Sequence, residues 1–237
     1  MILKSSLSAG SSFLALSILL SASADAALVA GWTIPTAFPT GAGNVPTGVM
    51  YSVGAANQGD QTAGSELKSV HALAAATYTS PAGNGSQYAF SSNNWSIGDY
   101  YEARLSTLGY ESISVSWDQA RSSTGPATFE LLVSTDGVNF TVVDVAGSAT
   151  YAVLQSGGGG APGTWSSTTY NPLYTFSEAV ALADNQAEVT FRFRSLVTAA
   201  ATGSNRIDNV FISGNVIPAP GALALAGLAG LIGRRRR

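Results

Sequence analysis

Short runs in which apolar and polar residues alternate are the feature that most restricts the fold of this chain. The segment 112–117 reads SISVSW, with Ile113, Val115 and Trp117 on one side, and the segment 189–194 reads VTFRFR. Successive residues of a strand point to opposite faces, so each run predicts a strand with one buried and one solvated face.

Further strands and one turn follow from the same reasoning. The run 206–213 is apolar on both faces, which is expected of a strand in the middle of a sheet. Asp136 and Gly137 supply a tight turn after an alternating run that places Phe129, Leu131 and Val133 inward. The predicted strands of this group are 100–105, 128–133, 140–145 and 206–213.

One segment carries a different spacing. Leu67, Val70 and Ala74 recur at helical intervals, so a short helix is expected within 66–76. The rest of the chain contains 26 glycines and 9 prolines and is 46% apolar. That composition excludes a disordered or mainly helical chain and predicts an all-β, antiparallel β-sandwich. Residues 27–215 suffice for one domain with one core.

Charge and reactive side chains exclude several classes of function. The body from residue 27 to 216 has six basic and thirteen acidic residues, a net charge of −7, so a nucleic-acid partner is not expected. The chain has no cysteine, which excludes disulfides and thiolate chemistry. Its one histidine, His71, is expected to serve in packing or on the surface, because no neighbouring motif orients it as a base.

The N-terminus has the three parts of a secretory signal peptide. Lys4 gives a positive start, residues 13–20 read FLALSILL, and Ala24-Asp25-Ala26 is a small-x-small cleavage site. We expect export, with cleavage after Ala26 by signal peptidase, so that residues 1–26 form the signal segment. The alternative is a buried N-terminal helix, although this segment lacks an amphipathic period.

The C-terminal segment 216–237 has a motif, an apolar stretch and a basic end. Pro218-Ala219-Pro220 precedes the stretch GALALAGLAGLIG at 221–233, and the chain ends with Arg234, Arg235, Arg236 and Arg237. Such a stretch spans only ~20 Å as a helix, whereas the hydrocarbon core of a bilayer is ~30 Å thick. A terminal arginine cluster marks the cytoplasmic side, which places the body outside the membrane.

This arrangement resembles the PEP-CTERM sorting signal of Gram-negative-type bacteria. The resemblance covers about twenty residues and implies recognition by an exosortase, a membrane protease that cuts at the motif and passes the body to the cell surface. Ala219 stands where that signal usually has glutamate. The resemblance therefore implies a transient membrane anchor, followed by a cell-surface or extracellular location in which exopolysaccharide is a partner. The alternative is a plain C-terminal membrane tail.

The body resembles the jelly-roll domains of PEP-CTERM proteins and, more distantly, laminin-G-like and MAM-like extracellular modules. The resemblance covers most of 85–215 and rests on four segments: 94–100 (NWSIGDY), 117–119 (WDQ), 134–140 (STDGVNF) and 206–210 (RIDNV). It implies that the sandwich is a jelly roll.

Candidate sites for chemistry are few. Asp208 and Asn209, with Asp60 or Asp99, offer oxygen ligands for Ca²⁺, yet they lack the spacing of a known calcium motif. The alternative is that Asp208 accepts hydrogen bonds from loop N–H groups. The remaining acids considered as a glycosidase pair lie mostly at outward strand positions, where charges solvate a face: Glu102, Glu111, Glu130 and Glu188.

Aromatic residues in or near predicted loops permit sugar binding: Trp95, Tyr100, Trp165, Tyr170 and Tyr174. The alternative for these five is core packing, which Trp117 is expected to show because it shares the inward phase of Ile113. A glycan site requires two or more coplanar aromatics exposed on one concave face.

Two classes of function remain. The first is an exported, non-enzymatic envelope or matrix protein with a structural or interaction body, and the second is a carbohydrate-binding module, Ca-dependent or part of a glycan-active protein. We assign no catalytic, cofactor-binding or metal-binding residue.

Overall fold

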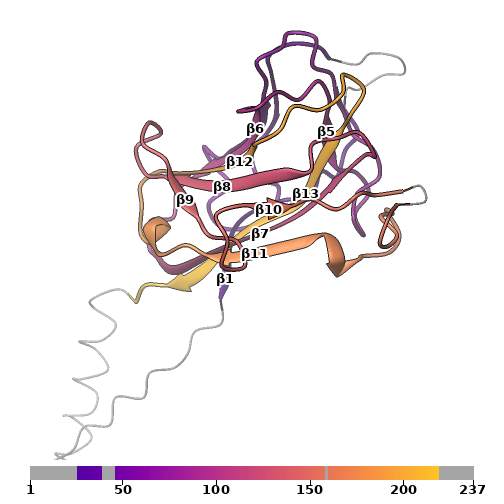
Figure 1. Ribbon diagram of the computed structural model, residues 1–237. Coiled ribbons are helices and arrows are strands. Elements are labelled where there is room, and N and C mark those ends of the chain that lie inside the picture. The colour runs from indigo at the N-terminus through magenta and orange to yellow at the C-terminus, as the bar shows by residue number, and fades with distance from the viewer. Residues whose placement is uncertain (1–25, 39–45, 158–159, 219–237) are drawn as a thin grey trace, which may run out of the picture.

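A computed structural model describes residues 26–38, 46–157 and 160–218, which form two antiparallel sheets packed face to face (Figure 1). Sheet I contains β1 (Ala27–Trp32), β4 (Tyr78–Thr79), β5 (Phe90–Ser92), β7 (Tyr110–Arg121), β11 (Thr175–Ala179) and β13 (Asn205–Val216). Sheet II contains β2 (Met50–Gly54), β3 (Glu66–Val70), β6 (Tyr100–Leu105), β8 (Thr128–Ser134), β9 (Thr141–Val143), β10 (Tyr151–Ala152) and β12 (Val189–Ser195). Two short 3₁₀ helices, η1 (Pro172–Tyr174) and η2 (Ala181–Ala183), flank β11.

The chain winds between the sheets in the manner of a jelly roll. From β5 to β8, and again from β10 to β13, each strand crosses to the opposite sheet. The resulting orders are β5-β13-β7-β11 in sheet I and β6-β12-β8-β10 in sheet II. Two four-stranded sheets of this order define the jelly roll, so the predicted fold class is confirmed.

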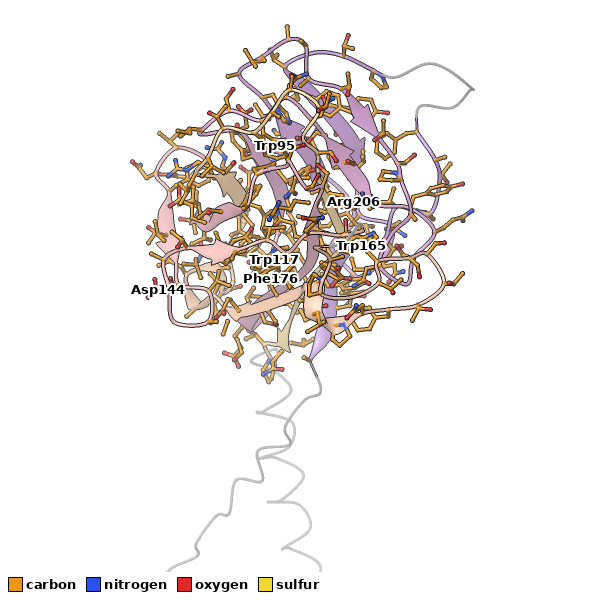
Figure 2. All side chains as sticks on the ribbon, turned by 45° about the vertical axis from the view of Figure 1, so that its right-hand side comes forward. Trp95, Trp117, Asp144, Trp165, Phe176 and Arg206 are labelled. Atoms are coloured by element: carbon orange, nitrogen blue, oxygen red, sulfur yellow. The ribbon has the colours of Figure 1, made fainter. Side chains whose placement is uncertain are left out.

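Alternating side chains fill the space between the sheets. Ile113, Val115 and Trp117 of β7 are buried, as predicted. The Trp117 ring lies 4.9 Å from that of Phe193 in sheet II and stacks on Phe176 of β11 at 5.3 Å (Figure 2). Each large apolar side chain buried in this way contributes about 1.5–3 kcal/mol. β13 is central in its sheet, as the apolar run predicted.

The predicted hairpin is present with a shorter second strand. Gly137 has a φ of 71°, a conformation that favours glycine, and β8 pairs with β9. Asp136 accepts hydrogen bonds from the backbone of Asn139 and Val138, which hold its pKa well below the ordinary value. The turn is therefore closed by the side chain of its own first residue.

The helix expected within 66–76 is wrong, because residues 66–70 form strand β3. Leu67 and Ser69 point into the core, and β3 pairs with β6 along its whole length. On the other face Lys68 bonds Glu102 across the strand pair at 2.9 Å. Cross-strand pairing of this kind outweighs the helical spacing, which rests on only three residues.

The two ends of the body leave the sandwich together. β1 begins at Ala27, which pairs with Gly214 of β13, so the first and last described strands meet at one end of the sandwich (Figure 1). β13 runs on to Val216, one residue beyond the predicted boundary at 215. Residues 1–25 of the signal segment, the apolar C-terminal stretch and the arginine cluster lie outside the described residues, as do Ala219 and Pro220 of the motif. Within the described ranges no helix is long and apolar enough to cross a bilayer.

Candidate functional site

Two buried aspartates lie side by side on the outer face of sheet I. Asp118 of β7 and Asp208 of β13 are direct cross-strand partners, and each is 1% exposed. Their neighbours Trp117 and Ile207 point into the core, so both carboxyl groups point away from it. Loops cover them on the outside.

Asp208 anchors the loop that follows β4. Its Oδ2 accepts hydrogen bonds from the Asn84 N–H, at 2.8 Å, and from the Ser86 hydroxyl. Gly83 permits this approach, because a Cβ there would collide with Ser86 and with the Asp208 carboxylate. Burial raises the pKa of Asp208 to about 7, although these hydrogen bonds oppose the shift. The expectation that Asp208 accepts hydrogen bonds from loop N–H groups is confirmed.

Asp118 is held by a bulge in β13 and by β11. The pairing of β13 with β7 shifts between Asp208 and Phe211, and Asn209 within this bulge has a φ of 46°. The Asn209 amide donates to Asp118 at 2.7 Å, and the Thr175 hydroxyl donates at 2.5 Å. Burial raises the pKa of Asp118 as well, against these same bonds.

A pocket of about 310 Å³ opens beside Asp118, and we call it the Tyr170 pocket. Tyr170 is 53% exposed, and its hydroxyl bonds Thr175 at 2.6 Å. The Ser116 hydroxyl makes no hydrogen bond within the described part of the chain, and Asp118 retains unused lone pairs. The pocket is lined by Asn84, Gly85, Ser116, Asp118, Tyr170, Thr175, Asn209 and Phe211. One accessible ring beside acceptors and hydroxyls, without a basic side chain, suits an uncharged ligand rich in hydroxyl groups.

The residues considered for Ca²⁺ do not come together. Asp60 accepts a hydrogen bond from Tyr110, and Asp99 lies beside His71. The hydrogens of Asn84, Ser86, Thr175 and Asn209 point at the two buried carboxylates, whereas Ca²⁺ requires six to eight oxygen ligands. Among the described residues no group of three or more metal-binding side chains exists. The donor set therefore does not fit this ion.

A second pocket, of about 350 Å³, is lined mainly by apolar groups that include Trp32, Phe38 and Tyr51. The faces of Tyr51 are covered, because it stacks on Phe38 at 5.1 Å and on Tyr78 at 5.4 Å. Trp32 is 2% exposed. Neither Tyr51 nor Trp32 therefore offers a free ring face to this pocket.

The five aromatic residues proposed for sugar binding differ in exposure. Trp95 and Tyr174 are buried, so core packing is correct for these two. Trp165 and Tyr100 are half-buried, and Trp165 is fixed by a hydrogen bond from its ring N–H to the Ala82 carbonyl at 2.7 Å. Tyr170 is the one exposed member of the group. The requirement for two coplanar exposed rings is not met by these five residues.

His71 lies in a buried polar row that the sequence did not reveal. Its Nδ1 is 3.0 Å from Asp99 and its Nε2 is 3.0 Å from the Ser69 hydroxyl. This is the order of a Ser-His-Asp triad. Ser69, His71 and Asp99 are all at most 3% exposed, and His71 packs against Trp95 at 4.5 Å. The row therefore has no access for a substrate, and His71 is a packing residue, as expected.

The outward glutamates of sheet II are also engaged. Glu102 bonds Arg192 at 2.5 Å, and Glu130 bonds Arg194 at 2.6 Å. Both glutamates are less than 10% exposed, so the expectation that they merely solvate the face is wrong. Long arginine side chains lie across them and exclude water.

These features define an antiparallel jelly-roll sandwich with a polar pocket on one face. No family model matches the chain, and no curated protein matches it significantly. Among solved structures, it is similar to a Clostridium thermocellum xylanase 10B fragment with CBM22-1 and GH10 modules complexed with xylohexaose, at 17% identity and TM-score 0.41, over 78% of this chain and 28% of that one. It is also similar to the K1 cleaved adhesin domain of Lys-gingipain from Porphyromonas gingivalis W83, at 14% identity and TM-score 0.40, over 78% and 97% of the two chains. A third is TmCBM61 in complex with β-1,4-galactotriose, at 12% identity and TM-score 0.32, over 63% and 88%.

Proposed function

We propose that this chain is an exported, non-catalytic carbohydrate-binding module whose Tyr170 pocket holds one uncharged sugar unit. The observation that carries the proposal is the combination, in one pocket, of an exposed ring with hydroxyl and carboxylate groups that have unused hydrogen-bonding capacity. Sugar rings present apolar C–H faces to an aromatic ring and hydroxyl groups at their edge, and this pocket offers a partner for each.

Binding fits the site better than hydrolysis does. A glycosidase uses one carboxyl group with a raised pKa as general acid and a second, ionised one as nucleophile or base. Burial raises the pKa of both Asp118 and Asp208. However, Asp208 does not line the pocket, and Ser86 and Asn84 cover it. A general acid must reach the glycosidic oxygen, so this pair supports a role in holding the pocket rather than in cleaving a bond.

Export and sorting form the second part of the proposal. The segment 1–26 directs the chain out of the cell, and the tail at 216–237 holds it until an exosortase-like protease cuts near Pro218-Ala219-Pro220. The pairing of Ala27 with Gly214 supports this, because both processing sites then lie at one end of the body. Mass spectrometry of the surface protein should find Ala27 first and no C-terminal arginines; intact arginines on most molecules would contradict the sorting role.

A purely structural envelope role is the alternative, and the burial of Trp95 and Tyr174 favours it. A glycan array probed with the purified full-length chain, with and without Ca²⁺, distinguishes the two functions. The proposal predicts binding of uncharged glycans that is independent of Ca²⁺. A chain that binds no glycan on the array would support the structural role instead.

A further inference from the structure

The guanidinium of Arg206 has no acidic side chain paired with it within the described residues. Four of the other basic residues of the body lie within 3.9 Å of a glutamate: Lys68, Arg104, Arg192 and Arg194. Arg121 donates to three backbone carbonyls. Within the described part of the chain, the side chain of Arg206 makes neither a hydrogen bond nor an ion pair, and its Nε is fully buried without a partner. Burial lowers its pKa, partly offset by Tyr101 and Tyr174.

The surroundings hold this side chain in place without neutralising it. Arg206 lies on the outer face of sheet I, and its guanidinium carbon is 5.8 Å from the centre of the Trp165 ring (Figure 2). Trp165 is itself fixed by Ala82 and packs edge-on against Tyr174 at 5.2 Å. An unpaired, partly buried charge costs stability, and a ligand that brings a negative charge would recover that cost.

Arg206 lines a pocket of about 220 Å³, which we call the Arg206 pocket. Its walls contain no acidic residue, and four of its hydroxyl side chains make no hydrogen bond among the described residues: Thr77, Thr79, Thr202 and Ser204. Hydroxyl groups can donate to and accept from the hydroxyls of a sugar, and a guanidinium matches the two oxygens of a carboxylate or sulfate.

We propose that the Arg206 pocket binds the anionic substituent of an acidic saccharide, a carboxylate or a sulfate ester on a sugar ring. It is separate from the Tyr170 pocket and extends the proposed glycan binding to charged polymers. A nucleic acid is a poor ligand here, because one arginine faces a body of net charge −7. The hydroxyl-lined wall selects a sugar that carries a single anionic group near the arginine.

The test compares matched ligands on the full-length protein by calorimetry. The probes are oligogalacturonate, its methyl ester and an oligosaccharide of sulfated galactose. Wild type should bind at least one of the two acidic probes about tenfold or more tighter than the uncharged ester, as expected for charge-assisted hydrogen bonds. The acidic probe that binds more tightly than the ester identifies the anion, a carboxylate or a sulfate. If neither acidic probe binds more tightly than the uncharged ester, the proposal is overturned.

Two variants separate recognition from a structural role. Arg206→Met should abolish the preference for the acidic probe, and Arg206→Lys should restore part of it, because the charge returns without the planar fork. The melting temperature of Arg206→Met should equal or exceed that of wild type, since the variant removes an unpaired buried charge. A lower melting temperature together with an unchanged preference would overturn the assignment.

Two further controls define the ligand and keep the two pockets distinct. Inorganic sulfate alone should shift the melting temperature less than the oligosaccharide does; an equal shift would overturn recognition of a saccharide. Tyr170→Ala should weaken binding of uncharged glycans and leave the ratio of acid to ester unchanged. A wild-type protein that binds an acidic probe but no uncharged glycan would contradict the Tyr170 pocket and not the Arg206 pocket.

Discussion

The two outer faces of the sandwich use similar residues in opposite ways. On sheet II, Glu102 lies between Lys68 and Arg192, and the rings of Tyr100 and Phe140 pack on Arg192 at 4.4 and 3.8 Å. On sheet I, Arg206 and Asp208 lie two residues apart on one strand, and neither has a counter-charge within the described residues. The charges on sheet II neutralise one another and serve the fold. On sheet I the loop covers Asp208, and only the Arg206 charge remains available for a ligand.

The loops over sheet I explain why its charges are unpaired while those of sheet II are paired. The strands of sheet II exchange ion pairs directly between neighbouring strands, so their charges meet without help. The outer face of sheet I is covered by the segments around Asn84 and Tyr170, which replace solvent with neutral donors and leave two pockets. Binding residues on such loops are positioned by the rigid sheet beneath them.

The core between the two sheets is where a substitution should lower stability most. Trp117→Ala should lower the free energy of unfolding by about 3–5 kcal/mol, because it opens a cavity between Phe193 and Phe176. Denaturant unfolding measures the change. A variant that unfolds like the wild type would show that the two sheets do not meet at Trp117.

The pH dependence of stability tests the unpaired carboxyl group on sheet I. The pKa of Asp208 is raised to about 7, above the ~3.9 of an exposed aspartate, so the folded state binds an extra proton between these values. This contribution to stability is complete below pH ~3.9 and is lost as the pH rises through about 7, a fall of roughly 4 kcal/mol. Asp208→Asn cannot ionise and should remove this part of the pH profile. Parallel profiles for the two proteins would contradict the assignment.

Breaking an ion pair on sheet II should lower the free energy of unfolding by a smaller amount, and only where the pair is buried. Glu102→Gln leaves Arg192 without its acid and should cost about 2–3 kcal/mol, because Glu102 is 4% exposed. The control is Glu188→Gln, which removes an exposed partner of Arg104 and should change stability by less than about 0.5 kcal/mol. Equal effects in urea unfolding would show that burial does not distinguish these pairs.

Many strands of the sandwich can be predicted from the sequence, because the alternation of apolar and polar residues is a strong signal. The runs ending at Trp117 and at Arg194 give the strand, its inward face and its burial without further information. The helix prediction for 66–76 was wrong because three apolar residues at helical spacing were given more weight than the alternation of residues 66–70. That alternation is short, and it forms a strand because β6 pairs with it. Its partners in β6 lie 30 to 38 residues further along the chain.

The candidate site was less predictable, since it depends on contacts between distant segments. Asp208 was identified as an anchor of a loop, but its partners Asn84 and Ser86 lie more than 120 residues away. Nothing in the local sequence marks Asp118 as its neighbour or Arg206 as unpaired. Tyr170 was named among five aromatic residues, and only the fold shows that it is the exposed one.

Binding of uncharged glycans by Tyr170→Ala and by Phe140→Ala shows which face of the sandwich holds the sugar. Tyr170 lies at the pocket on sheet I, whereas Phe140 covers Arg192 on sheet II. Removing the ring at Tyr170 should weaken binding about tenfold or more, as expected from the loss of about 1.5 kcal/mol of aromatic contact, and removing the ring at Phe140 should leave affinity unchanged. Affinity electrophoresis with the glycan selected from the array measures both variants. If Phe140→Ala loses binding and Tyr170→Ala retains it, glycans bind on the face of sheet II and the account is wrong.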